Sequence, residues 1–267
     1  MTTPALEART TGGAFGPVSA AFAERGLVRM IRVPSIVVPS ILMPIFFVVA
    51  FSGSFAAAVQ IDGYGTDKAV NWMTAWAILQ GSAFSGMGAA GAAATDLENG
   101  FFDRIRLAPV HPLTVLAGGL LYSVIRAVIP VTAVLLVAFG LLDADMPGGA
   151  LGFVFVYVSA LGVAVVMSLL ALAVVFTFKT LQSLSFAQIL IFTMMFLSVG
   201  QAPLVVMDGW LHAVAAVNPI TNILRLCRQG FLGDVTWSTT WPGLVSLAGL
   251  TVFFGALAIW RYDRISD

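Results

Sequence analysis

The stretch ALGFVFVYVSALGVAVVMSLLALAVVFTF, residues 150–178, decides the fold because it contains no charged side chain over its whole length. A helix of about 20 apolar residues crosses the hydrocarbon core of a bilayer, since each residue rises about 1.5 Å and the backbone polar groups pair within the helix. This stretch therefore predicts a transmembrane helix.

Working outward, five more stretches pass the same test of length and apolarity. The six predicted spans are 36–59, 70–94, 113–142, 150–178, 184–206 and 242–260. Stretch 70–94 is the weakest by hydropathy because it is rich in Gly and Ala, a composition that suits close helix contact. The predicted fold class is an all-α polytopic membrane protein with six transmembrane helices.

The composition excludes a soluble domain. Hydrophobic residues make up 59%, charged residues only 10%, and the mean hydropathy is +0.97, whereas soluble domains average about 25% charged residues. Lys and Arg total 13, as do Asp and Glu, so no net charge favours a nucleic-acid partner. The single cysteine, Cys227, excludes an internal disulfide and is expected to be a buried apolar residue.

The basic residues predict the orientation, because Lys and Arg in short flanks resist translocation. With the N-terminus inside, one side holds Arg9, Arg25, Arg29, Arg32, Arg104, Arg106, Lys179, Arg261 and Arg264, and the other holds Lys68, Arg225 and Arg228. Both termini are therefore predicted to be cytoplasmic, in a multi-pass protein of the cell inner membrane.

The N-terminal region divides into a tail, 1–16, expected to be disordered, and a basic interfacial helix, 17–34. Arg25, Arg29 and Arg32 share one stripe of that helix, and Pro34 ends it. An ordinary basic flank is the alternative. Pro39 and the length of the first span disfavour a cleaved signal peptide, although small residues at 56–58 keep that alternative open. Residues 261–267 form the other predicted cytoplasmic tail.

Residues 95–109, TDLENGFFDRIRLAP, separate the second and third predicted spans and mix charges with large apolar residues. Thr95 and Glu98 have capping-box spacing, which predicts the start of a short cytoplasmic helix. Leu97, Phe101 and Ile105 would form an apolar ridge on it. The ridge indicates a docking surface for a cytoplasmic partner or, alternatively, packing onto the protein's own helices.

The segment at about 207–241 is apolar but broken, which predicts an outer helical hairpin between the fifth and sixth spans. Asn218 and Pro219 predict a helix start, since Asn caps and Pro suits the first turn. Arg225 and Arg228 are expected to face away from the apolar stripe of that helix.

No catalytic or metal-binding constellation is visible. His111 and His212 are predicted on opposite sides of the membrane, and neither has an acid at metal-ligand spacing. Glycines in the second span lack the Lys and Ser or Thr of a nucleotide cradle. Instead, small residues recur at every fourth position, which predicts close helix packing. The two stripes are Ser82, Gly86, Ala90, Ala94 and Gly81, Ser85, Ala89, Ala93.

Arg126 is the one ionisable residue predicted deep inside a span, where charge is expensive and often functional. It indicates a path for an anionic substrate, or an arginine that snorkels to the membrane surface. Phe192, Met194, Met195 and Phe196 are expected to line a lipophilic route or simply to pack.

The order of these segments resembles the permease subunit of type-2 ABC exporters, the group that includes daunorubicin-resistance permeases. The matching segments are an amphipathic helix before span one, ENGFFDRIRLAP at 98–109, SVGQAP at 198–203 and NPIT at 218–221, followed by Arg225 and Arg228. The likeness covers nearly the whole chain. One departure is that Leu97 splits Asp96 from Glu98, where many relatives carry a more charged run.

The resemblance implies a coupling helix that sits on a separate ATPase subunit, which binds ATP and Mg, with two permease chains and two ATPases in the assembly. It assigns coupling to Asp96, Glu98, Gly100, Phe101, Asp103, Arg104, Ile105 and Arg106, and the outer hairpin to Gly200, Pro203, Asn218, Pro219 and Arg225. This chain has no Walker sequence, so no enzyme activity or bound cofactor is expected in it.

Export of a lipophilic drug-like compound or lipid is therefore the leading hypothesis. An ion-coupled secondary transporter would place several ionisable or broken-helix features near the midplane, often in two related halves. A membrane enzyme would show clustered His, Asp or Glu at one face. A noncatalytic assembly subunit stays open as a further alternative.

Overall fold

The computed structural model describes residues 15–33, 37–101 and 113–265. This part of the chain is helical and contains no strand. Of the predicted coupling residues, Asp103, Arg104, Ile105 and Arg106 lie outside the described residues, as does His111.

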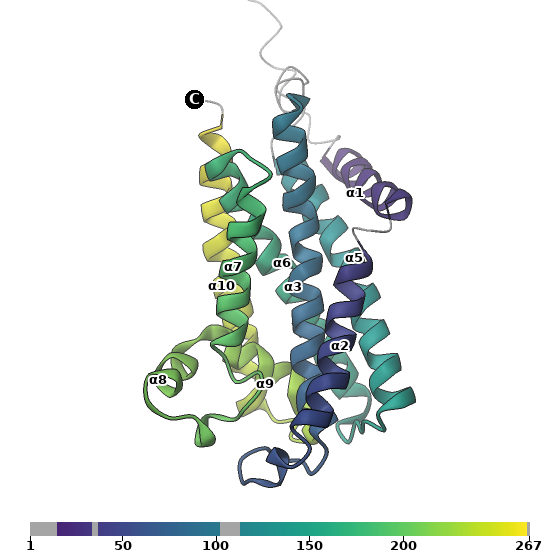
Figure 1. The fold of residues 1–267 in the computed structure, drawn as a ribbon. Coiled ribbons are helices and arrows are strands. Elements are labelled where there is room, and N and C mark those ends of the chain that lie inside the picture. Colours follow the sequence, from purple (N-terminus) through teal and green to yellow (C-terminus); the bar gives the residue numbers. More distant parts are fainter. Residues whose placement is uncertain (1–14, 34–36, 102–112, 266–267) are drawn as a thin grey trace, which may run out of the picture.

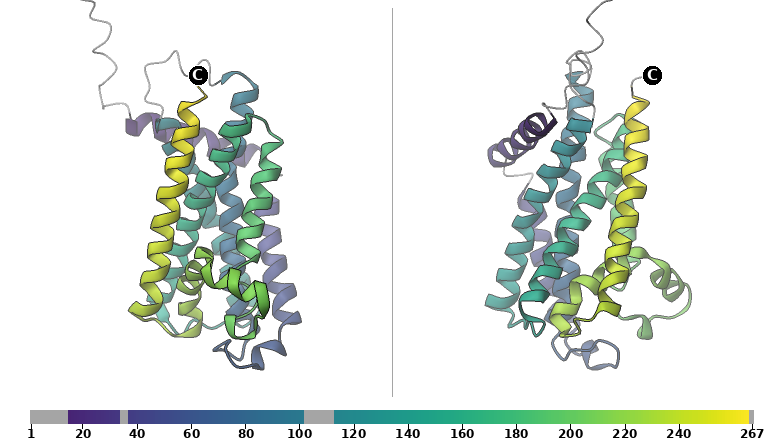
Figure 2. Two further views of the ribbon diagram at one scale, coloured as in Figure 1. Left: turned by 90° about the vertical axis from the view of Figure 1, so that its left-hand side faces the viewer. Right: turned by 180° about the vertical axis from the view of Figure 1, so that it is seen from behind.

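The long helices run alongside one another in a bundle, with α1 across one end and the α8–α9 pair at the other (Figures 1 and 2). The C-terminus lies at the same end as α1, which we call the α1 end; the opposite end is the α9 end. The helices are α1 Phe15–Arg32, α2 Val38–Ser54, α3 Ala69–Glu98, α5 Leu113–Leu141, α6 Gly149–Phe178, α7 Ser183–Phe196, α8 Gly209–Val217, α9 Pro219–Leu232 and α10 Trp237–Asp263. Short 3₁₀ turns occur at Ala58–Gln60 and Leu204–Val206.

Within the described residues, three helices are long and apolar enough to cross a membrane, namely α5, α6 and α10. Two further apolar helices are shorter, with 17 residues in α2 and 14 in α7. Helix α3 has 30 residues, but its Ala and Gly content lowers its hydropathy. The helices thus agree in position with the six predicted spans, while differing in length.

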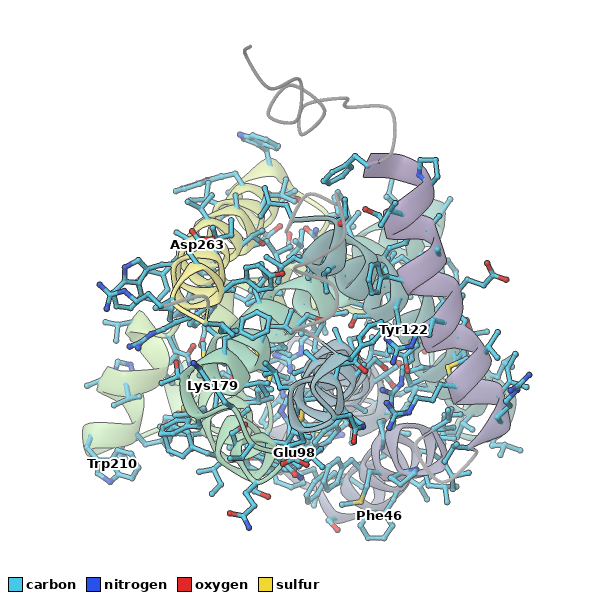
Figure 3. All side chains as sticks on the ribbon, turned by 90° about the horizontal axis from the view of Figure 1, so that it is seen from above. Phe46, Glu98, Tyr122, Lys179, Trp210 and Asp263 are labelled. Carbon is cyan, nitrogen blue, oxygen red and sulfur yellow. The ribbon has the colours of Figure 1, made fainter. Side chains whose placement is uncertain are left out.

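Viewed from the α1 end, helix α3 lies inside the bundle with α2, α5, α6 and α7 around it, while α10 lies beyond α6 (Figure 3). Helix α3 packs against α2, α5 and α6. The prediction of close packing along its small residues is confirmed at Gly86, where a Cβ atom would come within 2.7 Å of the Ala164 carbonyl oxygen on α6. The Ser168 hydroxyl donates a hydrogen bond of 2.7 Å to the Gly86 carbonyl.

The prolines of two neighbouring helices face another glycine of α3. A Cβ atom at Gly81 would lie 2.9 Å from the Pro44 ring of α2 and 3.1 Å from Pro130 of α5. Both prolines stand inside their helices, where each removes a backbone hydrogen bond. Because Gly81 has no side chain, both proline rings approach the backbone of α3 closely. Gly81 therefore sets the spacing of the three helices at this point.

Helix α7 ends ten residues before the predicted end of the fifth span, at Phe196 rather than Val206. Apolarity alone predicted a continuous helix. The Asn218 side chain donates hydrogen bonds of 2.8 Å to the carbonyls of Met194 and Leu197, which satisfies groups that the next helical turn would have used. The chain then leaves the helix and packs as an irregular segment onto α9.

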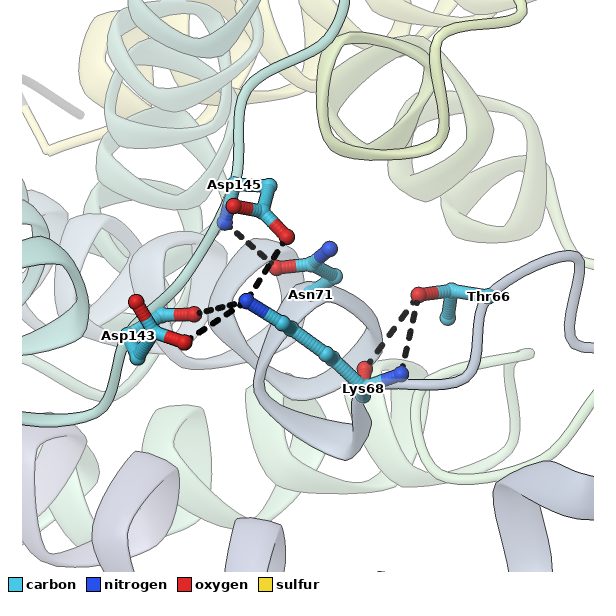
Figure 4. A network of polar contacts seen from close by, with 5 residues as sticks. All are labelled: Thr66, Lys68, Asn71, Asp143 and Asp145. Carbon is cyan, nitrogen blue, oxygen red and sulfur yellow. Dashed lines mark hydrogen bonds and ion pairs between the residues drawn. The ribbon is translucent and has the colours of Figure 1, made fainter.

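A lysine joins two loops at the α9 end (Figure 4). The Lys68 ammonium lies 2.8 Å from a carboxylate oxygen of Asp143 and 2.9 Å from one of Asp145. The Asn71 side-chain carbonyl accepts from the Asp145 backbone N–H at 2.9 Å. The hydrogen bonds to Asp143 and Asp145 raise the pKa of Lys68 to about 12, and the hydrogen bond from Lys68 lowers the pKa of Asp143.

These pKa shifts predict a pH window for the Lys68 cluster. The folded pKa of Lys68 exceeds its ordinary value of 10.5, so its stabilisation is fully present below 10.5 and is lost as pH rises through about 12. The pKa of Asp143 lies below its ordinary value of 3.8, so the stabilisation that Asp143 contributes is lost as pH falls below 3.8. Since these groups are exposed, the effect is small.

Thermal unfolding of wild type and Lys68→Met between about pH 8 and pH 12 tests this window. The two melting temperatures should differ slightly at the lower pH and converge at the upper one. A difference that grows with rising pH would contradict the assignment.

Candidate functional site

The C-terminal end of α3 lies at the α1 end of the bundle and contains the first of the predicted coupling residues. Helix α3 continues through Thr95 to Glu98, so the capping-box prediction of a helix start at Thr95 is wrong. The Thr95 hydroxyl instead donates to the Gly91 carbonyl, one turn earlier in the same helix. Gly100 has a φ of +65°, a left-handed conformation that glycine adopts without strain, and the helix ends there.

Asp96 ties this helix end to α1. Its carboxylate accepts two hydrogen bonds from the Arg25 guanidinium, at 2.6 and 2.8 Å, and Asp96 is only 7% exposed. The same guanidinium lies 4.4 Å from the centre of the Phe101 ring. Arg25 therefore bridges a helix that lies across the bundle and the chain leaving α3, in a bidentate geometry that resists rotation.

Glu98 ties the same helix end to the turn between α6 and α7. Its carboxylate accepts a hydrogen bond of 2.7 Å from the Leu181 backbone N–H. Helix α6 ends just before this turn, at Phe178, and the next residue, Lys179, has a φ of +57°. Glu98 ends α3 and Lys179 directly follows α6, so both lie at the α1 end of the bundle (Figure 1). The last turn of α3 thus contacts both α1 and the turn between α6 and α7.

Arg126 is on α5 and is 4% exposed, as expected for an arginine predicted within a span. A Cβ atom at Gly88 of α3 would come within 2.3 Å of its guanidinium, so the glycine makes room for the charge. Tyr122, one turn earlier on α5, lies beneath α1, where a Cβ at Gly26 would come within 2.7 Å of its ring (Figure 3).

Arg126 lines a crevice of about 310 Å³ between α1, α3, α5 and the start of α7. Its lining residues are Gly26, Arg29, Phe84, Met87, Gly88, Gly91, Ala92, Thr95, Tyr122, Arg126, Leu181 and Leu184. The charged and hydroxyl groups come mainly from α1 and α5, whereas α3 and α7 provide mostly small or apolar side chains.

The aromatic residues predicted on a lipophilic route follow α7 from this crevice toward the α9 end. The Phe84 ring, which lines the crevice, meets the Phe192 ring edge-on at 5.2 Å. Phe192 lies 5.7 Å from Phe196, and Phe196 meets Trp76 of α3 edge-on at 5.1 Å. Met195, on the same helix, is fully buried. The phenylalanines therefore form a row along α3 and α7, whereas the Met195 side chain has no exposed surface in this chain.

The hairpin of α8 and α9 is held by Asn218, as its predicted role in helix capping required. Its side-chain oxygen accepts from the Ile220 N–H at 2.9 Å and caps α9, while its amide donates to the end of α7. Pro219 occupies the first turn of α9. Pro203 stands just before the 3₁₀ turn at Leu204–Val206. The Asn218 side chain therefore hydrogen-bonds both the C-terminal end of α7 and the N-terminal end of α9.

Arg228 is the residue that the sequence interpretation placed incorrectly. It was expected to face away from the apolar stripe, together with Arg225, but it is only 2% exposed, whereas Arg225 is exposed. Its guanidinium donates to the carbonyls of Trp72, Val199 and Gly200 at 3.2, 3.0 and 2.9 Å. It also lies 3.5 Å from the centre of the Trp72 ring.

Gly200 is positioned by the same group of contacts. A Cβ atom there would come within 2.4 Å of the Trp76 ring, so only glycine allows the chain to pass between that ring and Arg228. No side-chain pattern in the sequence marks Arg228, because its acceptors are backbone carbonyls, which every residue has. Nothing in the sequence separates Arg228 from Arg225, since both are arginines of the same largely apolar segment.

Metal chemistry has no evident centre in the described part of the chain, where no group of three or more His, Cys, Asp or Glu side chains could hold an ion. Two candidate sites stand out. One is the junction at the end of α3, where Asp96, Glu98 and Phe101 contact α1 and the α6–α7 turn. The other is the crevice beside it that Arg126 lines.

Two comparisons with known proteins identify the family. The family model of ABC-2 type transporters matches residues 20–232 of this chain. The chain is also similar to the daunorubicin resistance ABC transporter permease protein DrrB1 of Streptomyces coeruleorubidus, with 25% identity over 246 residues that cover 89% of this chain and 83% of that protein. In this family ATP binding resides in a separate ATPase subunit, and the permease itself hydrolyses no ATP. The chain therefore belongs to the ABC-2 type transporters, as a multi-pass membrane permease subunit.

Proposed function

We propose that this chain is the permease of an ATP-driven exporter that moves a lipophilic drug-like compound or lipid out of the cytoplasm. Two copies, or this chain and a homologous one, assemble with two cytoplasmic ATPase subunits. The family membership supports the partnership with an ATPase, and the relative's name refers to drug resistance.

The proposed topology has six spans, α2, α3, α5, α6, α7 and α10, with the α1 end in the cytoplasm. Both ends of the described chain lie at this end of the bundle, which supports an even number of crossings (Figure 1). The α1 end also contains several basic residues, as expected of a cytoplasmic side: Arg25, Arg29, Lys179 and Arg261. The α8–α9 hairpin would close the pathway on the outer side.

The observation that carries the proposal is the junction at the end of α3. Asp96 and Phe101 contact Arg25 of α1, and Glu98 binds the turn that precedes α7. A push on the segment that follows Phe101 therefore reaches α1, α3 and α7 together. The predicted coupling residues at 103–106 would receive that push from the ATPase.

Glu98→Ala and Phe101→Ala test this junction in permease–ATPase complexes reconstituted in liposomes. Each substitution removes one contact of the α3 end. ATP-driven export of pyrene-labelled lipids and alcohols should therefore fall on the order of tenfold, which is within the range of coupling factors typical of two linked sites. ATP hydrolysis should continue without its response to substrate. Membrane abundance should stay normal, because Glu98 is exposed and makes a single surface contact.

Glu24→Ala is the matched control, since Glu24 is an exposed acid on α1. Its export and hydrolysis should equal those of wild type. Unchanged substrate-stimulated hydrolysis and export in both junction variants would refute the coupling role. A complex that binds the ATPase but never transports would favour an assembly subunit, and export driven by an ion gradient without ATP would favour a secondary transporter.

A further inference from the structure

We propose that one side of α3 binds an uncharged lipophilic molecule through its carbonyl oxygens, with the side chains of Trp72, Trp76 and Gln80 as hydrogen-bond partners. We call these three side chains the donor stripe. The inference rests on the proposed export function and specifies its cargo: a compound that carries two or more ketone, ester or amide carbonyls on an apolar body.

The donor stripe follows the axis of α3. Its members are spaced four residues apart, so their side chains lie about one turn apart on the same side of the helix. Phe84 occupies the next position of this series. From Trp72 to Phe84 the helix rises about 18 Å at 1.5 Å per residue, which is more than half of the hydrocarbon thickness of about 30 Å.

The polar atoms of the donor stripe are buried and unpaired. Trp72 is 5% exposed, and Trp76 and Gln80 are fully buried. Within the described residues, neither indole N–H and neither atom of the Gln80 amide has a hydrogen-bond partner, and the same holds for the Ser85 hydroxyl nearby. The buried Thr74 hydroxyl, in contrast, donates to a carbonyl one turn earlier in the helix. Unpaired buried polar groups are costly, so the stripe lacks a partner that a bound molecule would supply.

A cavity adjoins each end of the donor stripe. Phe84 lines the crevice of about 310 Å³ near the α1 end. Trp72 lines a second pocket of about 240 Å³ at the α9 end, together with residues of α9 and of the irregular segment that follows α7. Trp76 and Gln80 lie on α3 between these two spaces. The unpaired polar groups therefore follow the shortest path along α3 from one cavity to the other.

Aromatic rings cover the donor stripe between the two cavities. The Phe84 ring meets the Phe192 ring edge-on at 5.2 Å, and the Trp76 ring meets the Phe196 ring edge-on at 5.1 Å. Gln80 lies between these pairs, one turn from each α3 ring. Ring contacts are apolar and tolerate offset geometries, so the apolar body of a guest can replace one ring against another once α7 shifts away from α3.

The chemistry of the donor stripe selects an uncharged acceptor. An indole N–H only donates, and a glutamine amide both donates and accepts. Trp76 and Gln80 carry no charge, so an ionic group placed between the cavities would be buried without a counter-ion, which is expensive at this depth. A carbonyl oxygen accepts hydrogen bonds without carrying a charge. Two carbonyls about 6 Å apart would match neighbouring members of the stripe.

The experiment measures binding to the full chain, without the ATPase, in nanodiscs of diether phosphatidylcholine, a lipid that has no ester carbonyl. The probes are two pyrene-labelled hexadecyl chains, of which one carries two ketone groups about 6 Å apart and the other is the parent hydrocarbon. After subtraction of partition into empty discs, the diketone should bind wild type about tenfold tighter than the hydrocarbon, as expected for two net hydrogen bonds of ordinary strength.

Gln80→Met should lower diketone affinity by about fivefold and leave hydrocarbon binding unchanged. It should also raise the melting temperature of the purified chain by about 2–4 °C, because an apolar side chain of similar shape replaces an unpaired amide. A glutamine that only holds the fold together would have the opposite effect on the melting temperature, so this measurement separates the two roles.

Trp76→Phe keeps an aromatic ring and removes the N–H, so it should lower diketone affinity by about fivefold as well. Thr74→Val and Trp237→Phe are the matched controls. The Thr74 hydroxyl is already hydrogen-bonded within α3, and Trp237 is an exposed tryptophan at the start of α10. Both control proteins should bind the diketone as wild type does.

Three results would overturn the proposal. The first is equal binding of the two probes to wild type, and the second is an undiminished diketone preference in both Gln80→Met and Trp76→Phe. The third is a Gln80→Met protein that melts below wild type or fails to fold, because the amide would then be bonded within the fold.

Discs of ordinary diester phosphatidylcholine identify the occupant of a site that passes these tests. Loss of diketone binding in them indicates a bilayer lipid that binds through its ester carbonyls. Retained binding indicates a cargo distinct from the bilayer lipid.

The binding assay also tests the site independently of the proposed function, because it needs no ATP. A diketone preference in a complex that never exports would remove the proposed function and retain the site. ATP-driven export by a complex with no diketone preference would remove the site and retain the function.

Discussion

Arg228→Met is expected to lower the free energy of unfolding by on the order of 3 kcal/mol or more, because it leaves buried hydrogen-bond acceptors unsatisfied. The substitution leaves three backbone carbonyls, of Trp72, Val199 and Gly200, without the donor that now serves them. An unsatisfied buried acceptor costs about 1–3 kcal/mol, and the contact with the Trp72 ring is lost as well. Unfolding of the purified chain by heat and by titrated detergent measures the effect.

Arg225→Met is the control for this experiment, because Arg225 is three residues away on the same helix and is exposed. Its unfolding should match that of wild type. Arg228→Lys should recover only part of the stability, since one ammonium group replaces a planar fork of N–H donors. Equal stability of the Arg228→Met and Arg225→Met proteins would show that the guanidinium does not hold the irregular segment to α9.

Gly86→Val is expected to separate α3 from α6 and to lower the free energy of unfolding by on the order of 3 kcal/mol. The first added carbon would lie 2.7 Å from the Ala164 carbonyl oxygen and 2.9 Å from the Ser168 nitrogen. Both are backbone atoms of α6, so no side-chain rotation relieves the clash, and overpacking of this kind costs about 1–3 kcal/mol. The Ser168 hydrogen bond to Gly86, worth about 1 kcal/mol, is lost with it.

Gly249→Val provides the comparison on α10, where an added Cβ meets no atom within 4 Å. It places the same side chain within a long helix without the clash, so stability and ATP-driven export should both remain near wild type. Equal losses in the two variants would mean that a β-branched residue in a membrane helix, rather than the close contact of α3 with α6, causes the damage.

Much of the helical architecture could be predicted, because long apolar runs have few stable alternatives in lipid. The predicted fourth span, 150–178, coincides with Gly149–Phe178 within one residue, and the third span agrees equally well. Small residues every fourth position correctly indicated the close contact at Gly86, and the Asn-Pro pair at 218 correctly indicated a helix start. These features are local, so the sequence contains them.

The contacts of the candidate sites were less predictable. Thr95 and Glu98 have the spacing of a capping box, yet α3 simply continues through them, because helix packing outweighed the local capping preference. Asp96 was expected to contribute to coupling, but its pairing with Arg25 joins residues 71 positions apart. The sequence around Asp96 contains no feature that points to Arg25, and the sequence around Arg25 contains none that points to Asp96.

The sequence by itself thus determined the class of protein, the positions of its long helices and the residues most expensive to bury, since each follows from apolarity and from helix periodicity. Only the tertiary structure decided that α7 ends at Phe196, that Arg228 is buried while Arg225 is exposed, and that Arg29 and Arg126 line one crevice. The physical reason is that a buried charge or an unwound helix end is stabilised by whichever carbonyls and side chains the fold brings near. Those partners lie on other helices, far away along the chain.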